Sequence, residues 1–207
     1  TGLLILFSLS GFAQEHSAND GHNHQQELSK VQIDSILTAN VTPKLHTEKF
    51  EKLVIQDIGG RMMPMHTFAS EILRKLSKSD TYEDFDASQV FLSMQESPQL
   101  WTNTPLIYLR PMEADSIRTI IGVDKSVKHA RFVDFFSDNG AYKLEPYLAE
   151  AYNTQTPNGY QKKFRETNDR VRLLFDVIEG NSLKIFPIPD DENNKWISAK
   201  EFRLGNY

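Results

Sequence analysis

The sequence predicts a predominantly α-helical domain with a few short β-strands (α+β, mainly helical), preceded by a polar N-terminal tail. Three observations indicate this fold class. Apolar residues recur at i, i+3, i+4 and i+7 in several segments, as on the buried face of a helix. Runs of strand-forming residues are short and end at glycine or proline. The composition, with 39% hydrophobic and 11% aromatic residues, is typical of a chain with a packed core.

The charge and the cysteine count exclude several classes of protein. The chain has 207 residues and a net charge of −5, which argues against a nucleic-acid-binding protein, since that class needs a basic surface. Cysteine is absent, so disulfides, thiol nucleophiles, iron–sulfur clusters and a CxxCH haem-attachment site are excluded. The sequence also lacks GxSxG, GxGxxG, Walker A and HExxH motifs, and we assign no catalytic residue.

Residues 1–13 are expected to be the end of a signal peptide or of a transmembrane helix. Leu3–Ala13 is uncharged and apolar, and a polar stretch follows at once. The run is too short to span a bilayer, which takes about 20 residues, but it matches the apolar region of a signal peptide, with small residues at the cleavage position. We therefore expect residues 14–207 to lie on the periplasmic side of the inner membrane. Because the chain starts at Thr1, we expect a fragment of a longer protein.

Residues 14–40 are rich in polar residues and are interpreted as a mobile linker, with a short helix over Leu28–Leu37. His16, His22 and His24 lie close together in this stretch. Neutral imidazole is a ligand for zinc and copper, and an HxH pair can reach one ion. The residues therefore predict either a Cu/Zn-binding tract or a solvated linker.

From residue 41 to 207 the pattern is that of one folded domain. A strand over Leu53–Ile55 is expected to lead into a structural turn, in which the glycines supply backbone freedom and Arg61 pairs with a carboxylate such as Asp57. Thr67 is expected to cap the following helix. The residues assigned to this turn are Gly59, Gly60, Arg61, Pro64 and Thr67, with Arg61–Pro64 read as its irregular part.

The helices and strands that follow are predicted from apolar spacing and from their terminal residues. The first helix buries Ala69, Ile72, Leu73 and Leu76, and a second starts at Asp86 with Gln89 completing a capping box. The remaining predictions are a strand over Pro105–Leu109, a helix over Ala114–Ile121 ended by Gly122, a short aromatic helix over Phe132–Phe136, a long helix over Gln161–Glu179 that buries Phe164, Val171, Leu174, Phe175 and Ile178, and a strand over Leu183–Phe186.

Two short segments have side chains suited to metal chemistry. Met62–His66 (MMPMH) places thioethers beside an imidazole, and Met65 and His66 are candidate axial haem ligands; packing of the methionines under the next helix explains the segment equally well. Asp190–Asn194 resembles half of a calcium loop but lacks the central glycine and the terminal glutamate, so a solvated turn is favoured.

The stretch from His46 to Leu109, which begins HTEKFEKLVIQDIGGRMMP and ends in WTNTPLIYL, resembles the extracytoplasmic region of the Bacteroidetes-type fused cytochrome c biogenesis proteins (CcsBA, the ResB–ResC fusion, system II). The later segments FVDFFSDNGAYKL, NDRVRLLFDVIEG and LKIFPIPDDENNKW resemble that region in the same order, so the resemblance covers residues 43–197. The sequence departs from the family pattern at Met63, at His66 and at Asn168-Asp-Arg170, and the resemblance assigns His66 no family role.

The resemblance implies a part of a membrane protein that holds haem outside the cytoplasm and promotes its attachment to apocytochrome c. The Trp-rich haem-handling signature of that family is absent, because Trp101 and Trp196 have no tryptophan neighbour. We therefore expect a docking or scaffold domain whose partners are apocytochrome c and the membrane-embedded remainder of the polypeptide. The parent resembles a haem lyase, whereas this piece alone is expected neither to bind haem nor to catalyse the attachment. The alternatives are a periplasmic metal-binding module and a structural spacer.

Overall fold

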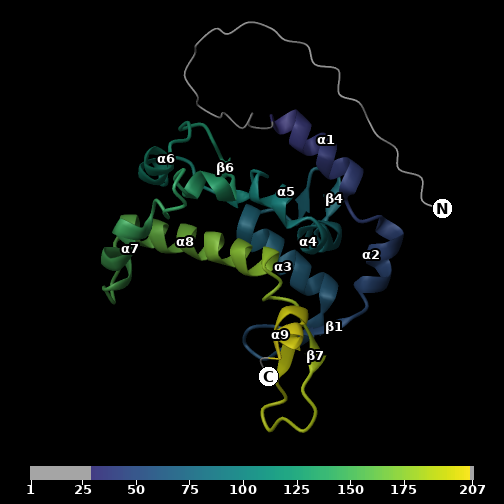
Figure 1. The fold of residues 1–207 in the computed structure, drawn as a ribbon. Helices are drawn as coiled ribbons and strands as arrows, with labels where there is room; N and C mark the ends of the chain where they lie inside the picture. The colour runs from purple at the N-terminus through teal and green to yellow at the C-terminus, as the bar shows by residue number, and fades with distance from the viewer. Residues whose placement is uncertain (1–28, 206–207) are drawn as a thin grey trace, which may run out of the picture.

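The computed structural model describes residues 29–205, and about half of them are helical (Figure 1). The fold class predicted from the sequence is therefore confirmed. The elements in chain order are α1 (Lys30–Asn40), α2 (Lys44–Phe50), β1 (Val54–Gln56), β2 (Met62–Pro64), α3 (Met65–Ser77), β3 (Thr81–Tyr82), β4 (Phe85–Asp86), α4 (Ala87–Glu96), α5 (Pro98–Thr102), β5 (Ile107–Tyr108), α6 (Asp115–Ile121), β6 (His129–Ala130), the 3₁₀ helix η1 (Phe132–Phe135), α7 (Glu145–Tyr152), α8 (Gly159–Ile178), β7 (Lys184–Pro187), β8 (Trp196–Ser198) and α9 (Ala199–Leu204).

The core lies between α3, α4 and α8. All four residues predicted for the buried face of α3 are buried, and so are the matching residues of α4. Phe68 and Phe91 join the two helices edge to face, with ring centroids 5.5 Å apart. The indole of Trp101 is fully buried and donates to Ser93 Oγ at 3.0 Å. The predicted capping box of Asp86 and Gln89 is present at the start of α4.

The long helix α8 crosses the molecule in front of α3 (Figure 1). Asn158 caps it in a capping box with Gln161, and it ends before Gly180, whose φ of 74° suits glycine. The prediction that Phe175 is buried is wrong, because this ring is 47% exposed and stacks on Phe132 with centroids 6.4 Å apart. Phe175 lies at the edge of the buried stripe, where the partner is the aromatic 3₁₀ helix rather than the core.

The helix predicted at Leu28–Leu37 is present as α1, with Ser29 as its N-cap. It buries Ile33 and Leu37 in the main hydrophobic cluster. This part of the segment expected to be a linker is therefore packed on the domain. Residues 1–28, which include the predicted signal or membrane segment, lie outside the described residues.

A four-stranded antiparallel sheet has the order β2-β1-β7-β8. Residues read from the sequence as an irregular turn form β2, in which Met63 pairs with Ile55. The chain has reversed its direction by Arg61, so the three residues that follow can pair with β1. Thr67 is not a helix cap: α3 already starts at Met65 with Pro64 as its N-cap.

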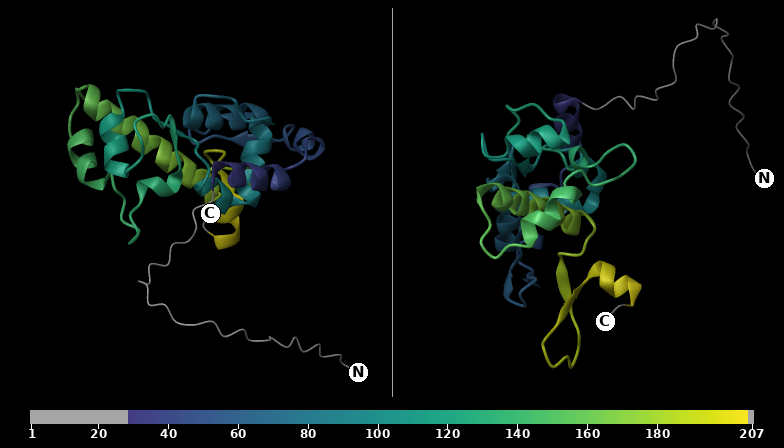
Figure 2. Two further views of the ribbon diagram at one scale, coloured as in Figure 1. Left: turned by 90° about the horizontal axis from the view of Figure 1, so that it is seen from above. Right: turned by 90° about the vertical axis from the view of Figure 1, so that its left-hand side faces the viewer.

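Strands β7 and β8 and helix α9 project from the helical body, as Figure 1 and the right-hand view of Figure 2 show. Gln56 ties this hairpin to β1, because its side chain donates to Asn194 O at 2.9 Å and accepts from Trp196 N at 2.8 Å. The calcium-like segment Asp190–Asn194 lies in the turn between β7 and β8. None of the helices between residues 29 and 205 is long and apolar enough to cross a bilayer.

Candidate functional site

The turn predicted at the two glycines joins β1 to β2. Gly60 has a φ of 84°, and its N–H donates to Asp57 O at 3.0 Å. The Asp57 carboxylate accepts from the Arg61 N–H at 2.9 Å and from Arg61 Nε at 3.3 Å. The backbone N–H of Arg61 holds the pKa of Asp57 below its usual range. These contacts explain the turn as a structural element.

The structure does not bring Met65 and His66 together as a pair of ligands. Met65 is fully buried in the core, whereas His66 is exposed, and its Nε2 lies 3.2 Å from Thr67 Oγ1. Successive residues at the start of a helix point in different directions, which places one side chain inward and the other outward.

Met65 and His129, two described side chains of the kinds that ligate haem iron, are already engaged within the fold. Haem iron takes axial ligands such as His or Met, but Met65 faces the core and His129 Nε2 already contacts Ser77 O at 2.9 Å. Within residues 29–205, no three His, Cys, Asp or Glu side chains are grouped so that they could hold a metal ion. His16, His22 and His24 lie outside the described residues.

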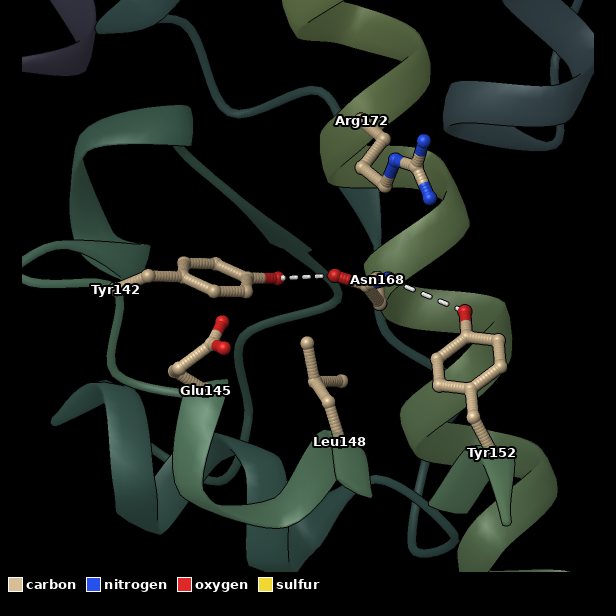
Figure 3. Close-up of a pocket in the computed structure, with 6 residues that line it drawn as sticks. All are labelled: Tyr142, Glu145, Leu148, Tyr152, Asn168 and Arg172. Carbon is tan, nitrogen blue, oxygen red and sulfur yellow. Dashed lines mark hydrogen bonds between the residues drawn. The ribbon is translucent and has the colours of Figure 1, made fainter. Parts of the chain in front are cut away.

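A pocket lies between α7, α8 and the segment before α7 (Figure 3). It has a volume of about 430 Å³ and opens to solvent. Helix α7 packs on α8 through the Tyr147 ring, which lies 5.2 Å from the Phe164 ring of α8; within α8, the Tyr160 ring lies 4.6 Å from the same Phe164 ring. The lining residues are Tyr142, Glu145, Leu148, Tyr152, Asn168 and Arg172.

Asn168 is the central polar residue of this pocket, and it is only 4% exposed. Its Oδ1 accepts from the Tyr142 hydroxyl at 3.1 Å, and its Nδ2 donates to Tyr152 Oη at 3.1 Å, as the dashed lines of Figure 3 show. Tyr152 in turn donates to Asp169 Oδ1 at 2.8 Å. Burial raises the pKa of both Tyr142 and Tyr152, so both phenols stay protonated at neutral pH.

Glu145 and Arg172 bring opposite charges to the pocket without neutralising each other. They lie on opposite sides of the Tyr142–Asn168 hydrogen bond (Figure 3). Neither forms an ion pair with any residue that the structure describes. The pocket therefore presents one unpaired carboxylate and one unpaired guanidinium around a fixed carboxamide.

A second, smaller pocket of about 240 Å³ lies on the neighbouring side of α8, and Asp169 joins it to the first pocket. Its wall is stabilised by Arg170, which donates to Lys75 O and Glu166 O at 3.2 Å each and lies over the Tyr108 ring at 5.9 Å. The residues that line it are Lys75, Lys78, Glu166, Asp169, Arg170 and Leu173.

The sequence analysis did not identify the residues of the first pocket. Helix α7 has only eight residues and a weak apolar pattern, and no element was predicted there. One signal was available in α8, because Asn168 follows Phe164 by four residues and precedes Val171 by three, which puts a polar residue in phase with the buried stripe. A buried polar residue in such a stripe indicates a hydrogen-bond network.

No family model matches this chain. The chain is similar to Protein NrfI of Wolinella succinogenes, with 31% identity over 196 residues, which are 93% of this chain and 19% of that protein. The chain therefore spans about a fifth of the length of the curated relative that it matches.

Proposed function

We propose that this chain is an extracytoplasmic docking domain of a membrane protein that assembles cytochrome c. The observation that carries the proposal is the similarity to NrfI over 93% of the chain, together with the ordered resemblance of residues 43–197 to the fused cytochrome c biogenesis proteins. Both similarities extend over most of the folded region rather than over one short motif.

The family resemblance suggests separate roles for the two parts of the parent protein. Haem would be held by the membrane-embedded remainder of the polypeptide. This domain would receive the unfolded apocytochrome and keep its thiols near that haem. Holding two reactants together raises their effective concentration, which accounts for a large part of many rate enhancements.

The surface of α7 and α8 supports a docking role. Tyr147, Tyr152 and Tyr160 of α7 and α8 are 36–44% exposed, and Tyr152 lines the pocket. Tyrosine and arginine are enriched among the residues that dominate protein interfaces. Because the Asn168 network fixes the pocket walls, a segment that binds there would lose less entropy than one that has to order a loop.

Capture of an apocytochrome tests the docking role. We expect the 207-residue chain to retain apocytochrome c and to leave the folded, haem-loaded cytochrome in solution, which serves as the matched control. Equal retention of both forms, or of neither, contradicts docking of an unfolded client, and retention of neither favours a structural spacer.

Titration of the same chain with haemin, Cu²⁺ and Zn²⁺ tests the alternatives. We expect no change in the haemin absorption band, in keeping with haem held elsewhere. Tight Cu²⁺ or Zn²⁺ binding that is lost on replacing His16, His22 and His24 favours a metal-binding module. For the location, a reporter active only outside the cytoplasm, fused after Tyr207 in the full-length parent, is expected to be active.

A further inference from the structure

We infer that the pocket of Tyr142, Glu145 and Asn168 binds a lysine or arginine side chain of a polypeptide partner. The inference deepens the proposed docking role and rests on it, because it names the chemistry of the segment that docks. Three features of the pocket support it: acceptor capacity left on its hydroxyl groups, a carboxylate without an ion-pair partner among the described residues, and an apolar surface beside that carboxylate.

The hydroxyl donors of the pocket are already used within the protein. Tyr142 donates its only O–H to Asn168 Oδ1, and Tyr152 donates its O–H to Asp169 Oδ1. A phenol has one donor and two acceptor lone pairs. What these two hydroxyls can still offer to a ligand is therefore acceptor capacity, which suits a ligand that donates.

Glu145 gives this acceptor-rich side of the pocket a negative charge. Its carboxylate is exposed and has no ion-pair partner among the described residues. In Figure 3 it points up beside the Tyr142 ring, and its charge contributes to the raised pKa of the Tyr142 phenol. A cation placed between Glu145 and the Tyr142 hydroxyl would donate a charge-assisted hydrogen bond to the carboxylate and could donate a second one to the phenol oxygen.

The rest of the pocket fits a long side chain better than a small free cation. Leu148 points into the pocket below the Tyr142–Asn168 bridge (Figure 3), which provides an apolar surface for methylene groups. Lysine and arginine bury their methylene stems on such surfaces while the charged end stays polar. Arg172, on the other side of the bridge, would meet a carbonyl or carboxylate of the same segment, so a polypeptide satisfies both ends of the pocket.

Binding of blocked pentapeptides to the 207-residue chain tests the inference. The first peptide has lysine at its centre between glycine and serine residues, and the second is identical except for glutamine in place of lysine. Amide chemical shifts of the pocket residues measure the Kd. We expect saturable binding of the lysine peptide and at least several-fold weaker binding of the glutamine peptide. Equal affinities for the two peptides would overturn the inference.

Two substitutions in α7 separate the pocket from general electrostatic attraction. Glu145→Gln removes the charge in the pocket, and Glu150→Gln removes the same charge from an exposed position of the same helix outside it. We expect Glu145→Gln to raise the Kd for the lysine peptide roughly tenfold, as for loss of a hydrogen bond to a charged group, and Glu150→Gln to change it by less than about twofold. Equal effects of the two variants would refute a specific pocket.

Failure of the inference can be distinguished from failure of the proposed function. Loss of peptide binding in Glu145→Gln with normal cytochrome maturation by the full-length variant supports the pocket and counts against its use in maturation. Retention of apocytochrome by the chain, with no difference between the lysine and glutamine peptides, supports docking and overturns the lysine pocket.

Discussion

Removing the Asn168 side chain should loosen the pocket by a measurable amount. Asn168→Ala deletes two hydrogen bonds of 3.1 Å, to Tyr142 and Tyr152, and each such bond contributes about 1 kcal/mol net. Tyr152 keeps Asp169 as an acceptor, and water can reach Tyr142 through the open pocket, so no buried group is left without a partner. Alanine also favours the helix by about 0.5 kcal/mol. We therefore expect a loss of about 1–2 kcal/mol in the free energy of unfolding.

Thermal melts followed by circular dichroism measure this loss. For a domain of this size, about 1–2 kcal/mol lowers Tm by about 2–8 °C. A double-mutant cycle with Tyr142→Phe is sharper, because two residues that share a hydrogen bond should show a coupling of about 1 kcal/mol. Tyr147→Phe is the matched control, since Tyr147 lies on α7 but contacts Phe164 rather than Asn168. Additive effects of Asn168→Ala and Tyr142→Phe would show that the bridge does not hold the pocket.

Three further predictions concern the scaffold. Leu73→Ala should lower the free energy of unfolding by about 2–5 kcal/mol, because it leaves a cavity in the core. His66→Ala, at an exposed position, should change Tm little and leave haem attachment by the parent near normal. Lost attachment with unchanged Tm would show that His66 belongs to the haem site. Arg118→Met should lower the free energy of unfolding, measured by chemical denaturation, by about 2–4 kcal/mol. The reason is that the buried guanidinium donates to the carbonyls of Leu109 (2.6 Å) and Val127 (2.7 Å). Arg74→Met, at an exposed position, is the control and should change this free energy little. The pKa of Asp57 is lowered in the folded state, so its contribution to the free energy of unfolding is complete above the unfolded pKa of about 3.9 and is lost as the pH falls through the folded value. Thermal melts of Asp57→Asn at acid pH should lack this loss of stability. The same dependence of Tm on pH in Asp57→Asn and in the unchanged chain would contradict the assignment.

The parts of the fold that the sequence predicts are those fixed by local interactions. The α4 capping box needs only Asp86 and Gln89, three residues apart, and the ends of α6 and α8 need only Gly122 and Gly180, both with positive φ. The buried face of α3 follows from apolar spacing because that helix lies between β2, α4 and α8 and has one consistent inward side.

The errors fall where a distant contact decides the local structure. Met62–Pro64 has no strand pattern of its own and becomes β2 because β1 offers a partner strand across the turn. Phe175 is in phase with the buried stripe of α8, but Phe132 of η1 covers it incompletely. Phe132 is remote from Phe175 in the sequence, and β1 reaches β2 only through a reversal of the chain. The spacing of residues within one segment does not predict such contacts.

The pocket depends on the same kind of distant contact. Asn168 is a polar residue within a helix until Tyr142, 26 positions earlier, and Tyr152, 16 positions earlier, reach it with their hydroxyls. The geometry exists only because α7 packs on α8 through Tyr147 and Phe164. Sequence reasoning could identify Asn168 as a buried polar residue, but the partners that turn it into a pocket are set by the packing of a short helix with little pattern of its own.

Glu145 and Arg172 differ in position from the charges that form ion pairs within the scaffold. Many cations of the described surface are neutralised by neighbours: Arg61 pairs with Asp57, Lys163 with Glu113, and Lys200 with Glu179. Glu145 and Arg172, like several other exposed charges, have no ion-pair partner among the described residues, and Glu145 lies in the first turn of α7, where a negative charge is favourable. They are set apart by their position, because they flank one fixed carboxamide in a concave site (Figure 3). This arrangement suits a polypeptide that brings a cation and a carbonyl to the two sides, and charge removal at Glu145 is the substitution that tests it.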